Sequence, residues 1–203
     1  MSTDTPRRRA GRPPQIDAEG IVVAAVALID AEGLEALTMR RLGTELGVTA
    51  MSLYRHLPNR DAVLAAVVNR LAGEVAVEAA DATPWPQALH GFARAYRRML
   101  LAHPNAVPLL ATHPVDEAAG RAVIAPVLER FRAAGITDGD AVTAVQSVAV
   151  YVLGHALAEV GTPPGTTRDP QPAEAAYYDQ WFDVGLDAMV QGFRHRLAAD
   201  PSC

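Results

Sequence analysis

The chain has 203 residues, of which 50% are hydrophobic, and a formal net charge of −5. This length suffices for one or two domains with a substantial core. An evenly acidic surface would exclude nucleic acid as a partner, but the charge is uneven. Residues 1–60 hold eight Arg against seven acidic residues, a balance of +1, whereas the remainder holds ten Arg against sixteen acidic residues, a balance of −6. Only the N-terminal part therefore suits a polyanion.

Compartment and membrane association can be judged from the cysteine content and the apolar runs. The sole cysteine, Cys203, excludes an internal disulfide and fits a reducing cytoplasm. The arginine-rich N-terminus has no apolar run behind it, so no signal peptide is expected. The longest apolar stretch, residues 141–157, contains four polar residues and is shorter than the ~20 residues that a bilayer requires. We expect this stretch to be a buried helix and the protein to be cytoplasmic, with no membrane partner.

Residues 1–16 are expected to form a disordered basic arm. The segment carries Arg7, Arg8, Arg9 and Arg12 and is too polar and too proline-rich to pack as a helix. A solvated tail or part of an expression leader is the alternative interpretation. Next to a DNA-binding unit, such an arm more plausibly follows phosphates or enters the minor groove.

The segment 38–60 carries the most specific pattern in the chain. Thr38 can begin a short helix with Leu42 and Leu46 on its apolar side, and Gly47 can adopt the left-handed conformation that ends it. Thr49 then begins a second short helix, with Val48 and Leu53 facing inward. Two short helices joined by a tight glycine turn predict a helix-turn-helix, although a helical hairpin that merely packs is the alternative.

The flanking residues complete a three-helix unit over residues 17–64. Asp17 begins a helix that runs through Glu32 and is stopped by Gly33, and Asn59 begins the helix that follows the motif. The outward positions of the second motif helix are Ala50, Met51, Ser52, Tyr54 and His56. Ala50 and Met51 favour apolar contact with thymine methyl groups over hydrogen bonds to base edges.

These residues resemble the tetracycline-repressor family of bacterial regulators. The resemblance is carried by residues 37–42, 46–48, 52–56 and 59–60, and by fainter matches at Trp85, 100–103, Gly135 and 153–154. It implies a ligand-responsive transcriptional regulator, in the usual case a repressor released from a palindromic operator. It also implies that Arg40 reads a guanine edge. The DNA-binding residues predicted beyond the arm are Thr38, Met39, Arg40, Thr49, Ala50, Met51, Ser52, Tyr54, His56 and Arg60.

Residues 65–203 are expected to form an all-α ligand-binding and dimerisation domain. Helical patterns cover 87–102, 116–134, 138–157 and 174–197, and a proline-rich loop covers 161–172. The helix over 141–157 is apolar nearly all round, which favours cover from a second copy of the chain, although a central helix of one subunit would look the same. The family pattern implies a homodimer formed by the last two helices.

The resemblance also places a ligand cavity in this domain. The predicted lining residues are Phe92, Tyr96, Met99, Leu109, Thr112, His113, Val127, Gln146, Tyr151 and His155. Ordinary core packing is the alternative for most of them. Gln146 and His155 are the polar positions on an apolar helix, where burial without a partner costs about 1–3 kcal/mol. An apolar, aromatic cavity of this kind suits a hydrophobic small organic molecule.

The departures from the family pattern limit the ligand. Where tetracycline repressors place a magnesium-binding histidine, this chain aligns Leu109, so no metal site and no cofactor are expected. An enzyme is also not expected, because Ser52 and His56 lie on the DNA-facing helix with no acid to orient the histidine. A helical small-molecule-binding protein that does not recognise an operator is the alternative function.

Overall fold

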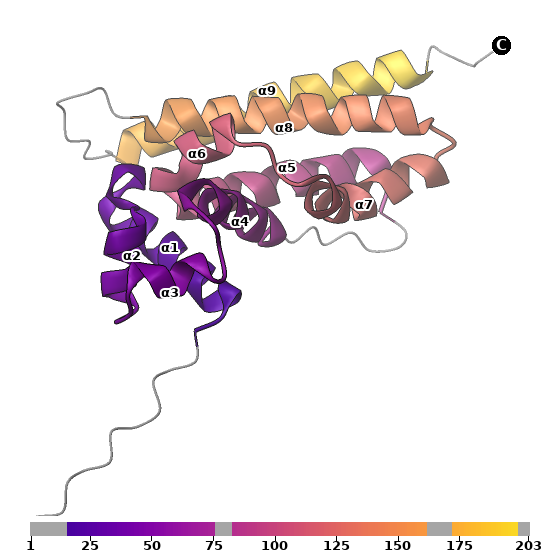
Figure 1. The fold of residues 1–203 in the computed structure, drawn as a ribbon. Helices are drawn as coiled ribbons and strands as arrows, with labels where there is room; N and C mark the ends of the chain where they lie inside the picture. Colours follow the sequence, from indigo (N-terminus) through magenta and orange to yellow (C-terminus); the bar gives the residue numbers. More distant parts are fainter. Residues whose placement is uncertain (1–15, 76–82, 162–171, 199–203) are drawn as a thin grey trace, which may run out of the picture.

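The computed structural model describes residues 16–75, 83–161 and 172–198, and these form helices and turns with no strand among them (Figure 1). The all-α prediction is therefore confirmed. The helices follow the order α1 (Ala18–Glu32), α2 (Met39–Glu45), α3 (Ala50–Tyr54), α4 (Arg60–Gly73), α5 (Trp85–Ala102), α6 (Val107–Thr112), α7 (Glu117–Ala133), α8 (Asp138–Val160) and α9 (Pro172–Ala198). Two 3-10 turns, η1 (Leu34–Ala36) and η2 (Pro104–Ala106), complete the described elements.

The N-terminal head consists of α1, η1, α2, α3 and α4. The side chain of Asp17 accepts a hydrogen bond of 2.8 Å from the backbone N–H of Gly20, and Asn59 caps α4 in the same way at Ala62. Both carboxylate and amide caps satisfy N–H groups that a helix start leaves free. Leu42 of α2 and Leu53 of α3 are fully buried, so the two short helices are held by their apolar sides.

Helix α4 joins the head to the body. It runs unbroken from Arg60 to Gly73, so the boundary that we expected between residues 64 and 65 falls inside a helix. Its buried side chains contact α1 on one side and α7 on the other, and one hydrophobic core extends through both parts of the chain. Helix α4 therefore belongs to the core of the head and to that of the body.

The body is a bundle in which α8 and α9 lie side by side along one face (Figure 1). Helix α5 packs beneath them and against α7. Gly135, with a φ of 74°, ends α7 in the left-handed region as its sequence position predicted. The Trp85 ring lies 4.6 Å from the Phe131 ring and fixes the start of α5 on α7.

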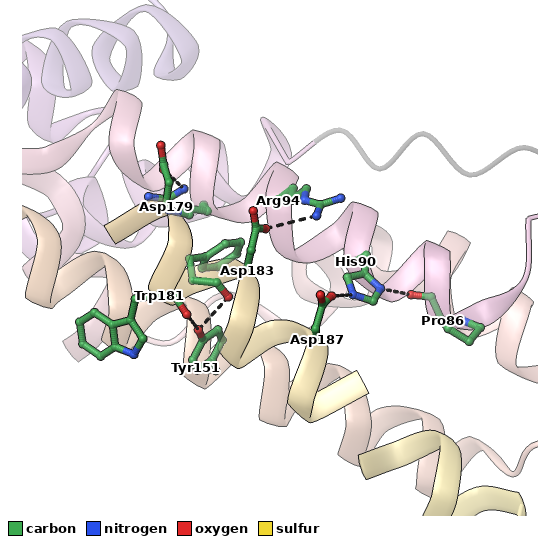
Figure 2. Close-up of polar contacts among 10 residues, drawn as sticks. Pro86, His90, Arg94, Tyr151, Asp179, Trp181, Asp183 and Asp187 are labelled. Atoms are coloured by element: carbon green, nitrogen blue, oxygen red, sulfur yellow. Dashed lines mark hydrogen bonds and ion pairs between the residues drawn. The ribbon is translucent and has the colours of Figure 1, made fainter. Parts of the chain in front are cut away.

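Two arginine–aspartate ion pairs and one histidine–aspartate hydrogen bond connect α5 to α9. Figure 2 shows the carboxylates of Asp183 and Asp187 directed at Arg94 and His90, at 3.2 Å and 2.8 Å. Arg97 bonds Asp179 at 2.7 Å and completes the series. The acidic residues are four positions apart and therefore share one side of α9, which sets the register of the two helices.

Helix α8 is, within the described residues, the one helix that is long and apolar enough to cross a membrane by length and composition. It has 23 residues and so extends beyond the apolar stretch 141–157 on which our expectation of a buried helix was based. The core helix of a soluble protein passes the same test, and this helix is packed on α5, α7 and α9. Its sequence therefore reflects burial within the bundle.

Candidate DNA-binding surface and ligand cavity

The turn between α2 and α3 is tight. Gly47 has a φ of 66°, in the left-handed region that favours glycine, and the N–H of Val48 donates a 2.8 Å hydrogen bond to the carbonyl oxygen of Gly43. A Cβ added at Gly43 would lie 2.9 Å from the Val48 carbonyl oxygen and 3.3 Å from the backbone nitrogen of Ala50. Glycine at position 43 is thus what allows α2 to approach the start of α3.

Helices α2 and α3 lie at the end of the head that is farthest from α8 and α9 (Figure 1), and both helices carry exposed side chains. Met51 is 73% exposed and Tyr54 is 43% exposed, which are large values for such side chains. We name this surface the α2–α3 face; its predicted members are Thr38, Arg40, Thr49, Ala50, Met51, Ser52, Tyr54 and His56, all exposed or half-buried. Apolar and polar groups alternate on it without an acidic side chain among these members.

The caps of the two motif helices differ. The Thr38 hydroxyl accepts a 3.1 Å hydrogen bond from the N–H of Arg41, as the sequence predicted. Thr49 is at the N-cap position of α3, but its side chain makes no capping bond and instead lies 3.1 Å from the Ser52 hydroxyl. Thr49 and Ser52 therefore present a paired set of hydroxyl groups at the leading end of α3.

Neighbouring arginines on α2 have opposite roles. Arg41 bonds Glu32 at 2.5 Å and Glu45 at 2.9 Å, and these bonds raise the pKa of its guanidinium and lower the pKa of Glu32. Arg40 is exposed, and the described part of the chain offers no ion pair or hydrogen bond to its guanidinium. Arg40 is thus the free cation of α2, whereas Arg41 holds α2 on α1.

Two predicted DNA contacts are placed elsewhere by the structure. The Met39 side chain is 8% exposed and belongs to the core, because the first turn of α2 presses it toward α1. The Arg60 guanidinium donates to the carbonyl oxygens of Leu37 at 2.7 Å and Leu34 at 3.1 Å, so it closes the end of η1 inside the head. Neither side chain is presented on the α2–α3 face, and Arg7, Arg8, Arg9 and Arg12 lie outside the described residues.

A cavity of about 140 Å³ lies between α4, α5, α7 and α8. Phe92, Tyr96 and Met99, all predicted from the sequence, line it along α5. The other lining residues are Ala72, Val75, Leu110, Val115, Gly120, Val123, Ile124 and Ala149. Burial raises the pKa of Tyr96, so its phenol stays protonated and supplies a hydroxyl group beside an otherwise apolar wall.

The other predicted cavity residues do not line this cavity. Leu109 and Val127 are fully buried in the core behind it, and Gln146 is exposed on the outer side of α8. Thr112 is exposed and its hydroxyl donates to the Pro108 carbonyl oxygen at 3.0 Å, while His113 lies 3.1 Å from the same hydroxyl. Helical periodicity identified the apolar face of α5 correctly but could not select which side of α8 faces inward, because that helix is apolar nearly all round.

Tyr151 and His155 lie at the α8–α9 contact and not at the cavity. The Tyr151 hydroxyl donates to the backbone carbonyls of Trp181 and Phe182, as Figure 2 shows. The His155 ring is 4% exposed and lies 4.8 Å from the ring of Trp181 and 5.3 Å from that of Phe182. Neither ring nitrogen of His155 has a hydrogen-bond partner in the described part of the molecule.

The pKa of His155 is lowered, first by burial and then by the nearby positive charge of Arg97. The Glu159 carboxylate, 3.7 Å from Nδ1, opposes that shift without forming a hydrogen bond. Arg97 itself bonds Glu159 at 2.8 Å and stacks over the Phe182 ring at 4.8 Å. His155 is therefore a neutral ring in an aromatic cluster.

The lining residues that sequence analysis missed are small or aliphatic. Ala72 lies in the last turn of α4 and Val75 lies just beyond its end, in a part of the ligand-binding domain for which we had predicted no cavity residue. Gly120, Val123 and Ile124 come from α7 and look like ordinary core positions. Among the described residues no group of three or more His, Cys, Asp or Glu side chains could hold a metal ion.

Residues 21–67 match the model described as bacterial regulatory proteins, tetR family, and residues 79–176 match the tetracyclin repressor-like C-terminal domain. The chain is 32% identical to the class A tetracycline repressor of Escherichia coli over 84% of this chain and 83% of that protein. The chain therefore belongs to the tetR family.

Other relatives are longer. The chain is 33% identical to an HTH-type transcriptional regulator of Saccharopolyspora erythraea over 76% of its own length and 65% of that protein. It is 33% identical to the transcriptional repressor DrrR1 of Streptomyces coeruleorubidus over 77% of its own length and 59% of that protein. The chain thus spans less than two thirds of the length of these two relatives.

Solved structures share the whole fold. ActR of Streptomyces coelicolor in complex with (S)-DNPA superposes with a TM-score of 0.75 at 26% identity, covering 90% of this chain and 99% of that one. BioQ in complex with its double-stranded DNA operator superposes with a TM-score of 0.66 at 28% identity, covering 88% and 98%.

Proposed function

We propose that the protein is a DNA-binding transcriptional repressor that a small, hydrophobic organic molecule releases from its operator. The α2–α3 face is the observation that carries this proposal: it exposes Met51, Tyr54 and the free guanidinium of Arg40 without an acidic residue among its members. The leading end of a short recognition helix contacts base edges in the major groove. The relatives named as repressors and the operator-bound BioQ structure support the same function.

Operator binding by one short helix requires a second copy of the head, which a two-fold dimer supplies. The outer faces of α8 and α9 expose Val150 at 72%, Tyr177 at 62%, Trp181 at 43% and Val184 at 62%. Gly154 lies on α8, and a Cβ added there would meet no atom within 4 Å. Clustered apolar exposure of this kind marks an association surface, so we assign the homodimer contact to α8 and α9, and the exposed Gln146 to its edge.

The effector is proposed to be a small aromatic molecule. A cavity of about 140 Å³ is comparable to those that hold a single benzene ring and is below the ~300 Å³ typical of drug-sized ligands. Phe92 and Tyr96, whose rings lie 6.0 Å apart, supply flat contacts, and the Tyr96 hydroxyl supplies one orienting hydrogen bond. A ligand of several rings would have to displace Val115 or the side chains of α7.

Magnesium-tetracycline is not the proposed effector. Leu109 offers no oxygen or imidazole donor, and the Thr112 and His113 side chains are engaged with each other and with the backbone of α6. Burying the many polar groups of this drug without partners would cost about 1–3 kcal/mol each. A cytoplasmic location and a non-catalytic role are proposed with this function. The Ser52 hydroxyl is engaged with Thr49, and among the described residues no carboxylate is hydrogen-bonded to His56.

The test combines DNA binding and thermal unfolding. The full chain should shift a DNA fragment from its own promoter region, and Arg40→Ala should weaken binding by ~1–3 kcal/mol and relax preference at one base pair per half-site. A ligand at 100 times its dissociation constant should add about 2.7 kcal/mol of stability. We expect this from mono- and bicyclic aromatics and not from tetracycline with magnesium. Aromatic binding without any DNA binding would instead support a small-molecule-binding protein that lacks operator recognition.

A further inference from the structure

His103 lies where three elements of the head and body meet. It follows the last residue of α5, and its ring is 16% exposed. Nδ1 is 2.8 Å from the Asp30 carboxylate on α1, and Nε2 is 3.2 Å from the Glu74 carboxylate at the end of α4. One imidazole thus contacts both helices that connect the head to the rest of the molecule.

The number of hydrogen bonds that this ring can donate depends on how many of its nitrogens carry a proton. Carboxylates are acceptors, so both ring nitrogens must carry a proton for both contacts to be hydrogen bonds. A neutral ring has one N–H and can satisfy one carboxylate only. The charged groups around it are Asp30 from α1, Glu74 at the end of α4, and Arg70 of α4, which lies 3.8 Å from Glu74 and also pairs with Glu19.

Two further contacts strengthen the connection. The Asn105 side chain on η2 donates a 2.9 Å hydrogen bond to the Asp30 backbone carbonyl, next to the end of α1. A helix C-terminus is the end that favours a cation, so an imidazolium beside the last turn of α1 is stabilised. In addition, the second carboxylate oxygen of Asp30 is buried and has no partner, which leaves the Asp30 side chain dependent on His103.

We propose that His103, through its contacts with the Asp30 and Glu74 carboxylates, is a positioning residue that fixes the DNA-binding head on the body. It ends the helix that carries Phe92, Tyr96 and Met99, and η2 behind it leads into α6, which contributes Leu110 to the cavity. Movement of α5 or of α6 at the cavity therefore acts on Asp30 and Glu74 through the side chain of His103. The effect of His103 on operator affinity rests on the proposed function, whereas its effect on the position of the head does not.

The placement of the head can be measured without DNA or effector. Spin labels at Glu35→Cys in η1 and Ala122→Cys in α7, both exposed sites, report the head-to-body distance in the full chain with Cys203→Ser. Labelled chain diluted in excess unlabelled chain isolates the distance within one subunit. We expect a narrow distribution of this distance in the wild type, because the His103 ring contacts both α1 and the end of α4.

Substitutions separate positioning from mere packing. His103→Leu keeps the bulk but not the donors and should give a distance distribution roughly twice as broad. His103→Arg retains two donors, so it should keep the narrow distribution. His195→Leu, an exposed position on α9, is the matched control and should behave as the wild type. An unchanged distribution in His103→Leu would overturn the proposal.

Operator affinity provides the second readout. His103→Leu should weaken binding about three- to tenfold, a modest effect because both carboxylates are partly exposed. If the wild type binds no promoter fragment while the label distances still depend on His103, the proposed function fails and the positioning role stands. If the wild type binds its operator and neither affinity nor distances respond to His103→Leu, the positioning role fails and the function stands.

Discussion

The Tyr151 hydroxyl on α8 donates a hydrogen bond of 2.9 Å to the carbonyl oxygen of Phe182 on α9. A Cβ added at Gly185 would lie 2.3 Å from that hydroxyl and 2.8 Å from the ring carbon that bears it. Helix α9 therefore passes so close to Tyr151 that a glycine is required at position 185. The hydrogen bond from Tyr151 thus connects α8 with α9, the two helices that we assign to the dimer surface.

Gly185→Ala should destabilise the protein by about 1–3 kcal/mol, because the ring of Tyr151 must move or the two helices must separate. Chemical denaturation at a fixed protein concentration measures this free energy of unfolding. Gly91→Ala on α5 is the control, since an added Cβ there meets no atom within 4 Å, and it should be neutral or stabilising by up to ~1 kcal/mol. Equal effects of the two substitutions would contradict the close approach.

Gly43→Ala should damage the helix-turn-helix itself. The added methyl group would meet the carbonyl oxygen of Val48 at 2.9 Å, and backbone cannot swing aside as a flexible side chain can. We expect a loss of about 1–3 kcal/mol in stability together with weaker operator binding, because α3 is displaced from α2. Gly73→Ala at the end of α4 has open space around it and serves as the comparison. Operator affinity equal to that of the Gly73→Ala variant would argue against a tight α2–α3 turn.

Most of the head could be predicted from the sequence because its signals are local. Asp17, Thr38 and Asn59 cap helices through bonds to residues three positions away, and Gly47 has the positive φ that its place in the turn implied. Partners that are distant in sequence could not be predicted in this way. The Arg60 guanidinium finds its carbonyl partners 23 and 26 residues earlier, a relationship that no spacing rule contains.

Arg60→Ala should therefore lower stability and leave the salt dependence of DNA binding unchanged. Removing two charge-assisted hydrogen bonds from part-buried carbonyls should cost about 1.5–3 kcal/mol. The slope of log affinity against log salt should match that of the wild type, whereas loss of a phosphate contact would lower it by about one unit per half-site. The measurement is a salt titration of operator binding below the unfolding temperature of the variant. A reduced slope with unchanged stability would restore Arg60 to the DNA interface.

Only part of the cavity could be predicted, because only some of its lining residues have a direction that is encoded locally. Phe92, Tyr96 and Met99 recur at spacings of four and three on an amphipathic helix, so their common inward direction is encoded locally. Helix α8 lacks a polar face, and its rotation is decided by its contacts with α5 and α9. Gln146 was consequently assigned inward although it is exposed, and Ala149 on the same helix was missed as a lining residue.

His155 should make the stability of the protein sensitive to acid. Burial, followed by the charge of Arg97, lowers the pKa of His155 in the folded chain, while in the unfolded chain the group titrates near ~6.5. The unfolded chain then binds more protons than the folded chain as the pH falls below that value. The contribution of His155 to the free energy of unfolding is therefore fully present above about pH 6.5. It is lost on acidification, by up to ~1.4 kcal/mol per pH unit for one proton.

Replacing the ring tests this cause directly. His155→Phe keeps an aromatic side chain among Tyr178, Trp181 and Phe182 but cannot be protonated, so its free energy of unfolding should fall less steeply between about pH 6.5 and pH 5. His195→Phe, at an exposed position of α9, should leave the slope unchanged. The comparison requires denaturant titrations of all three proteins at several pH values and one protein concentration, because dimerisation would add to the apparent stability. Parallel pH profiles for the wild type and His155→Phe would show that His155 is not the group whose protonation opposes folding.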